Sequence, residues 1–171
     1  MEAIKIMLFA TAAAIVYGVL HDLVTAHLCV EYFTIAHPPV FPTISPILLA
    51  LGWGVIASWW VGLALGVGLA MAARIGPPRK STLAELRRPV LRLMLATAAA
   101  AFVSGCVGAS LTAAGLVSLP GEWEAMIPPG KQVAFAADAW AHAASYGFGA
   151  LGGLFVIGGT IRRRWRPSRP T

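Results

Sequence analysis

Four apolar segments, each long enough to cross a lipid bilayer, make up most of this chain and constrain its fold more than any motif does. About 20 apolar residues in a helix span the hydrocarbon core, and such segments occur at about 4–30, 46–73, 90–117 and 133–161. Hydrophobic residues make up 58% of the 171, charged residues 12%, and the mean hydropathy is +0.75. These values indicate an integral membrane protein. We predict a single all-α domain over 1–171, folded as a compact four-helix transmembrane bundle with short loops.

The basic residues are distributed unevenly between the ends of these segments. Lysine and arginine are concentrated in the loop 74–89 and the tail 162–171, whereas the loops 31–45 and 118–132 hold only Lys131. Positive loops remain in the cytoplasm, so both termini should be cytoplasmic, in the inner membrane if the host is bacterial. Anionic lipid headgroups are sufficient partners for the net charge of +6, and a nucleic-acid partner is not indicated.

The start of the chain permits a second interpretation, a signal peptide cleaved after Ala26. His21 and Asp22 would be unusual immediately before a cleavage site. We therefore expect the segment to be retained as the first helix. That helix ends either near Ala26 or near His37, because Pro38 disfavours a helical conformation at the residue before it.

Small residues recur at every fourth position in the last three segments. Residues four apart share one helix face, and small side chains let helices approach closely where lipid offers no hydrophobic drive to associate. We expect these faces to pack against other helices, within the chain or in a homo-oligomer or a complex with other membrane subunits. They are Gly54, Ser58, Gly62 and Gly66; Ala100, Ser104, Gly108 and Thr112; and Ala137, Ala141, Ser145, Gly149 and Gly153.

Ionisable side chains inside the first and fourth segments indicate a functional site near the outward side. A charge at the centre of a span costs about 2.5–3.5 kcal/mol, so such residues usually face the protein interior. Imidazole and carboxylate groups at helical spacing are ligands for zinc, iron or copper. The predicted metal ligands are His21, Asp22, His27, Asp138 and His142.

Other residues are expected to complete this site. Glu31 is the candidate general base of a metal-dependent membrane enzyme that acts on a small or lipid-borne substrate. The prolines that follow His37 would stiffen a loop that folds back as a lid. The residues predicted to line the cavity or its lid are His37, Cys29, Tyr32, Trp140 and Tyr146.

Four alternatives remain open from the residues alone. His21 and His142 on facing helices are candidate axial ligands for haem. The same polar groups would serve a proton or ion pathway if they lined a wet channel. Asp138 and His142 would otherwise form a purely structural pair. A non-catalytic accessory or assembly subunit that packs through its glycine faces is the fourth. The two cysteines, Cys29 and Cys106, form no CxxC pair.

Overall fold

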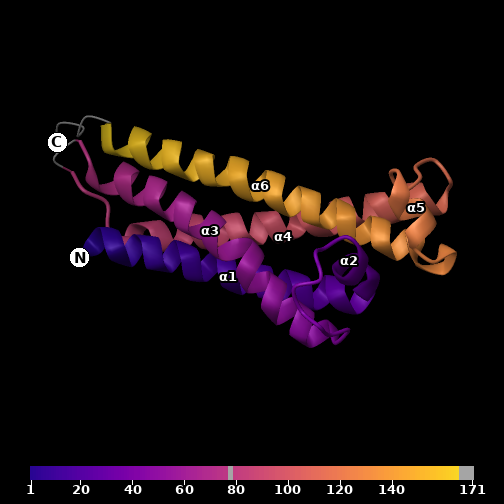
Figure 1. Cartoon of the computed structure of the whole chain (residues 1–171). Helices are drawn as coiled ribbons and strands as arrows, with labels where there is room; N and C mark the ends of the chain where they lie inside the picture. The colour runs from indigo at the N-terminus through magenta and orange to yellow at the C-terminus, as the bar shows by residue number, and fades with distance from the viewer. Residues whose placement is uncertain (77–78, 166–171) are drawn as a thin grey trace.

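The computed structural model describes residues 1–76 and 79–165, and within these residues all regular structure is helical. Four of the helices are long and apolar enough to cross a membrane. They lie lengthwise beside one another, and the N-terminus and the end of the last long helix lie at the same end of the molecule (Figure 1). The elements are α1 (Glu2–Leu28), α2 (Val30–Ile35), α3 (Pro46–Arg74), α4 (Leu83–Ala113), α5 (Glu122–Met126), the 3-10 turn η1 (Pro129–Lys131) and α6 (Gln132–Trp165).

The first long helix ends at Leu28, closer to the earlier of the two ends that the sequence allows. Cys29 is extended, with φ −148° and ψ 92°, and the short helix α2 begins at the next residue. The buried ring of Phe33 belongs to a cluster with Ala26 and Leu49. This contact requires α2 to turn back against α1 and α3, so the chain breaks its helix well before Pro38.

Glycines bring α1 and α3 into close contact. A Cβ atom built on Gly62 would lie 2.6 Å from Cβ of Ala14, and one built on Gly54 would lie 2.6 Å from Cα of Val19. Only glycine tolerates this approach of two backbones. The small-residue face of α3 is thus covered by α1.

A second close pair is formed by α4 and α6. Ser104 donates a hydrogen bond to the backbone oxygen of Trp140 at 3.0 Å, and Gly108 lies against the Trp140 side chain. Contacts between the α1–α3 pair and the α4–α6 pair are sparser than those within each pair. A cavity lies in the seam between the two pairs and is lined by residues of all four long helices.

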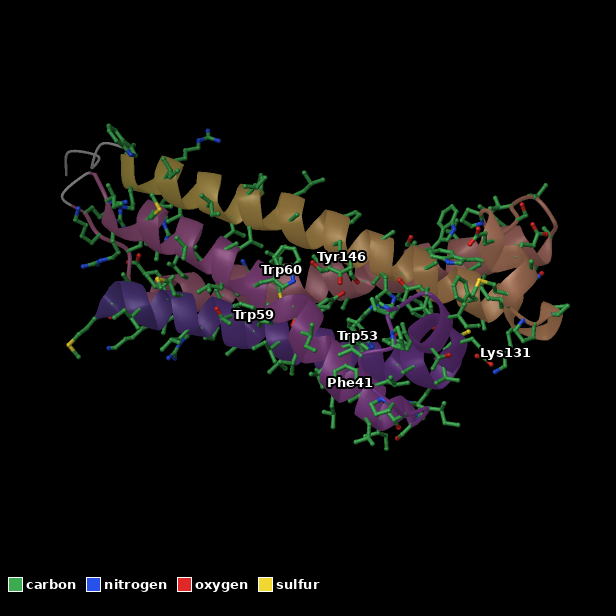
Figure 2. The ribbon with its side chains drawn as sticks, in the orientation of Figure 1. Phe41, Trp53, Trp59, Trp60, Lys131 and Tyr146 are labelled. Carbon is green, nitrogen blue, oxygen red and sulfur yellow. The ribbon has the colours of Figure 1, made fainter. Side chains whose placement is uncertain are left out.

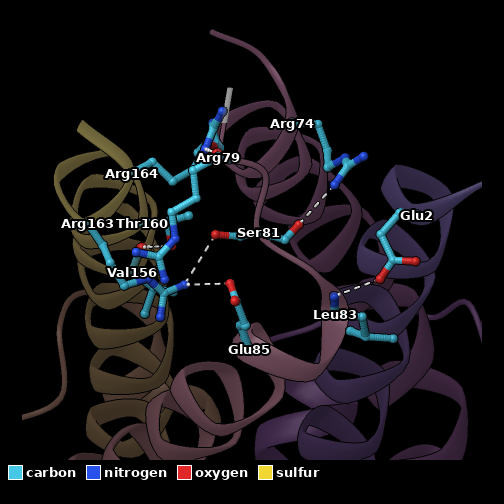
Figure 3. A network of polar contacts seen from close by, with 11 residues as sticks. Glu2, Arg74, Arg79, Ser81, Leu83, Glu85, Val156, Thr160, Arg163 and Arg164 are labelled. Atoms are coloured by element: carbon cyan, nitrogen blue, oxygen red, sulfur yellow. Dashed lines mark hydrogen bonds and ion pairs between the residues drawn. The ribbon is translucent and has the colours of Figure 1, made fainter. Parts of the chain in front are cut away.

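Polar contacts hold the helices together at the end that carries the N-terminus, here called the basic end (Figure 3). The Glu2 carboxylate accepts a hydrogen bond of 2.8 Å from the backbone N–H of Leu83, the first residue of α4. Buried Arg164 donates to the backbone oxygens of Ala72 and Ile75 at the end of α3. Both contacts satisfy backbone groups that helix ends leave unpaired. The opposite end, formed by α2, α5 and η1, is called the loop end.

Candidate metal site

The carboxylate of Asp22 on α1 and the imidazole of His142 on α6 meet in the protein interior. Asp22 is 5% exposed and His142 is 7% exposed, and Nε2 of His142 lies 3.3 Å from Oδ1 of Asp22. Asp22 precedes the end of α1 by six residues, and His142 follows the start of α6 by ten. At about 1.5 Å per residue, both lie roughly 9–15 Å inside the loop end.

The hydrogen bonding of His142 determines which of its nitrogens carries a hydrogen. Nδ1 is 2.8 Å from the backbone oxygen of Asp138; since a carbonyl oxygen only accepts, Nδ1–H is the donor. A neutral imidazole then has a lone pair at Nε2, which lies 3.3 Å from the acceptor oxygen of Asp22. Within the described part of the chain, Nε2 has no hydrogen-bond partner. A proton or a metal cation between Nε2 and Oδ1 would satisfy both atoms.

His21 adds a third donor atom beside this pair. Its ring lies edge-on to the His142 ring, with centroids 4.5 Å apart, and stacks on Tyr17 at 5.7 Å. Nε2 of His21 is buried, and no described residue forms a hydrogen bond with it. The orientation of the His21 ring is thus determined by ring contacts, which leaves a nitrogen available as a ligand.

The ligand atoms of His21, Asp22 and His142 all lie within 4.8 Å of one another. Two ligands bound at about 2.0–2.1 Å to a tetrahedral metal are about 3.4 Å apart. The 3.3 Å between His142 and Asp22 matches this edge. The third ligand atom, on His21, lies no more than 4.8 Å from the other two.

Helix α2 covers the site from the loop end. The Tyr32 ring lies 4.4 Å from the His142 ring, and the Phe33 ring 5.7 Å from it. Trp53 packs on the same cluster and contacts Phe41 at 5.6 Å (Figure 2). Aromatic rings therefore shield one side of the site from water.

His37 lies close to the site without joining the group of three. Its Nδ1–H donates a hydrogen bond of 3.0 Å to the backbone oxygen of Tyr32. Its ring stacks on Phe33 at 5.3 Å and lies 6.5 Å from the His142 ring. Burial lowers the pKa of His37 below its ordinary value, so the imidazole is neutral near pH 7. His37 forms part of the aromatic cover beside His142, and its role as a lid stays a prediction.

Asp138 is fully buried, but its carboxylate is not among the grouped ligands. The backbone oxygen of Asp138 accepts the hydrogen bond from Nδ1–H of His142. Both carboxylate oxygens are buried and form no hydrogen bond with any residue that the structure describes. A carboxyl group in this position carries a desolvation cost, which makes it a sensitive site for substitution.

Two further residues predicted for the site lie apart from it. His27 is exposed, and its Nδ1–H donates to the backbone oxygen of Leu23. Six residues separate it from His21, which rotates it by about 240° around a helix, so it faces away. Glu31 forms an ion pair of 3.6 Å with Lys131, whose position at the loop end is seen in Figure 2.

The side chains of Cys29 and Glu31 contact each other. The fully buried thiol of Cys29 donates to Oε2 of Glu31 at 3.4 Å. Burial raises the pKa of Cys29 to about 11. Burial alone would raise the pKa of Glu31, but a backbone hydrogen bond, the Cys29 thiol and the Lys131 ammonium hold it below its usual range. Cys29 is therefore a buried and protonated thiol near pH 7, and Glu31 is an ionised carboxylate paired with Lys131.

The other two residues predicted to line the cavity, Trp140 and Tyr146, lie in different surroundings. Trp140 faces α4, where it packs against Gly108. Tyr146 is half exposed and lines the cavity that adjoins His21, Asp22 and His142. Tyr17, which the sequence reasoning did not select, shares a hydrogen bond of 2.6 Å with Ser145 beside this cavity. Its place one helical turn before His21 was the available signal.

The cavity itself has a volume of about 120 Å³ and lies in the seam between the two helix pairs. Its polar end is formed by the histidines, Asp22 and the two tyrosines, and the rest is lined mostly by alanine, glycine and aliphatic side chains, together with Ser58, Met94, Thr97 and Ser145. Comparison of the chain with protein-family models, with curated proteins and with solved structures finds no significant match.

Proposed function

We propose that this chain is a membrane protein that binds one divalent transition-metal ion through His21, Asp22 and His142. The observation that carries the proposal is the approach of two acceptor atoms, His142 Nε2 and Asp22 Oδ1, to 3.3 Å. A cation between them would replace a mutual repulsion of lone pairs with two ligand bonds. The partnerless Nε2 of His21, judged over the described residues, supplies a third ligand.

The donor set favours a particular class of ion. Two imidazole nitrogens and one carboxylate suit zinc and iron(II), whereas calcium and magnesium prefer oxygen ligands alone. Three protein ligands leave at least one coordination position for water or substrate, which is typical of catalytic metal sites. A bound ion of this kind polarises a substrate oxygen or activates water.

We further propose an enzymatic role on a small or lipid-borne substrate. The buried position and the aromatic cover of Tyr32 and Phe33 support it, because exclusion of water strengthens electrostatic interactions within a site. Glu31 as general base stays a prediction, and its ion pair with Lys131 at 3.6 Å weighs against it.

The charge distribution supports an orientation with both ends of the chain in the cytoplasm. At the basic end, Arg74, Arg163 and Arg164 accompany the helix termini. Lys131 is the single lysine or arginine of the sequence between 93 and 161. By the positive-inside rule the basic end is cytoplasmic and the metal site lies in the outward half of the bundle.

Two of the alternatives are less well supported by the geometry. Axial ligation of haem requires the two imidazoles on opposite faces of the porphyrin, whereas the His21 and His142 rings are in direct edge contact at 4.5 Å. An accessory subunit that docks through its α3 glycines would need them exposed, whereas Gly54 and Gly62 are buried against α1.

Metal content tests the proposal directly. The protein is purified in mild detergent without added metals or chelators, and zinc, iron, copper, manganese and nickel are measured per chain. We expect about one equivalent of one metal in the wild type. His142→Ala and Asp22→Asn should lose it, while the matched control His27→Ala, which removes an exposed histidine of the same helix, should retain it.

Two results would overturn the proposal. One is an empty wild-type protein that still binds no metal after reconstitution with each ion. The other is equal loss of metal from His27→Ala and His142→Ala, which would show that binding does not depend on the buried group. Folding of each variant is checked by its elution profile and helical circular dichroism.

A further inference from the structure

The cavity beside the metal site is long and narrow. On α1 its lining runs from Ala10 to Asp22 and on α6 from His142 to Ile157, which corresponds to about 18–22 Å along the helix axes. Its volume of about 120 Å³ is far above the roughly 10–15 Å³ that one water requires. A volume of this size spread over such a length fits a slender chain.

The lining of the cavity is apolar away from the metal site. Apolar cavities do not hold ordered water well, since a water needs two to four polar partners. Beyond the metal-site end, hydroxyl groups come from Ser58, Thr97 and Ser145, and within the described residues no lysine or arginine lines the cavity. The aliphatic residues toward the basic end include Leu65, Leu69, Val90, Leu93, Val156 and Ile157.

The cavity also reaches the surface of the protein. Tyr146 and Ala150 line it and are both exposed, and Ala57 and Val61 on α3 are partly exposed. In the proposed membrane arrangement this surface faces lipid. A ligand would therefore enter sideways from the bilayer, with its chain toward the basic end and its polar group beside Tyr146.

We propose that the cavity binds a neutral lipid with a single apolar chain and an oxygen-bearing head group, a hydroxyl or a quinone carbonyl, placed at His21, Asp22 and Tyr146. The polar end presents both donors and acceptors, which such an oxygen matches. Among the described residues no lysine or arginine lines the cavity, so a phosphate or carboxylate head group would have no side-chain cation to pair with, and a metal ion held by Asp22 already has part of its charge neutralised. The inference rests on the proposed membrane function and names the substrate class of its metal site.

Glycines on α6 provide a matched pair of variants. A Cβ atom added at Gly149 or at Gly147 meets no atom within 4 Å among the described residues. The Cβ atom of a larger side chain therefore fits at either position without a steric clash. Gly149 lines the cavity, whereas Gly147 is exposed and does not. Leucine at 149 should fill the cavity, and leucine at 147 should point into lipid.

The experiment is photolabelling of the full chain in detergent with a long-chain alcohol that carries a diazirine in mid-chain, followed by peptide mapping. We expect labels on cavity residues of α3 and α6 in the wild type and in Gly147→Leu, and labelling about fivefold or more lower in Gly149→Leu, because a close-packed side chain excludes the ligand. Ala57→Leu, from the α3 side, should have the same effect if Gly149→Leu folds poorly.

Competition and metal content separate the possible outcomes. Unlabelled dodecanol or decylubiquinone should each be able to compete, and the stronger of the two identifies an alcohol or a quinone; competition by dodecanoate alone would overturn the proposed head-group class. Equal labelling of Gly147→Leu and Gly149→Leu would overturn the cavity as the binding site. If the cavity is labelled but the protein holds no metal, the lipid proposal stands and the metal proposal is rejected. If the protein holds metal but the cavity is not labelled, the metal proposal stands and the lipid proposal is rejected.

Discussion

Nε2 of His142 lies 3.3 Å from Oδ1 of Asp22, and this approach joins two helices, α1 and α6, that have few other contacts. The His142 Nδ1–H is already used by the backbone oxygen of Asp138. The Nε2–Oδ1 contact therefore depends on whatever lies between them, a proton or a metal ion. Whether a proton or a metal ion lies between these two atoms determines how firmly α1 and α6 are held together.

Replacing Asp138 should stabilise the protein if its carboxylate has no cation to bind. Asp138 is completely buried, and its two side-chain oxygens form no hydrogen bond with the described residues. Asp138→Leu keeps the number of side-chain heavy atoms and removes both partnerless oxygens, so the free energy of unfolding should rise by about 1 kcal/mol. Thermal unfolding in a fixed detergent measures this. A lower midpoint accompanied by lost metal would instead make Asp138 a ligand.

Truncation of Phe33 should loosen the cover of the metal site. Its side chain is 2% exposed and packs with Ala26, Leu49 and Ala50. Phe33→Ala should destabilise the contact between α2 and α3 by about 3 kcal/mol. Hydrogen exchange in 30–37 should become faster, and bound metal should leave faster on addition of a chelator. The adjacent exposed residue provides the control: Thr34→Ala should change neither rate.

The ion pair of Glu31 and Lys131 should contribute stability that depends on pH. The folded-state pKa of Glu31 is below its unfolded value of 4.5. Its contribution is therefore fully present above about pH 4.5 and is lost as the pH falls through the lower folded-state value. At pH 7 Glu31→Gln should lower the free energy of unfolding by about 0.5 kcal/mol, and the difference from wild type should vanish in acid. A difference that does not depend on pH would contradict the ion pair as its source.

Arg164 should be the most important arginine for stability at the basic end. It is 4% exposed and donates hydrogen bonds to backbone oxygens of Ala72, Ile75 and Arg79. Arg164→Leu leaves carbonyl groups at the end of α3 without these donors, at a cost of about 2–3 kcal/mol. Arg162→Leu, which alters an exposed arginine on the same helical turn, should cost far less. Equal midpoints for the two variants would contradict the capping role.

The sequence predicts the helical content and the number of long apolar helices because both depend on local composition. A run of about 20 apolar residues must satisfy its own backbone hydrogen bonds in lipid, which leaves helix as the available structure. The phase of a helix is local too. It places Asp138 and His142 on one face of α6 and turns His27 away from His21.

The break at Cys29 could not be predicted from the sequence. Neither glycine nor proline stands at that position, and the nearest proline is Pro38. The helix ends there because Phe33 is buried against Ala26 and Leu49, a contact between residues of three different elements. Only the folded chain reveals that this packing outweighs the continuation of α1.

The sequence by itself determined four membrane-spanning candidates and the ionisable residues within them, since hydropathy and helical period are properties of each segment alone. The tertiary structure decided which ionisable groups meet. Lipid gives no hydrophobic drive for helices to associate, so the rotation of each helix is set by close contacts such as Gly62 with Ala14 and Gly108 with Trp140. Those contacts bring Asp22 to His142.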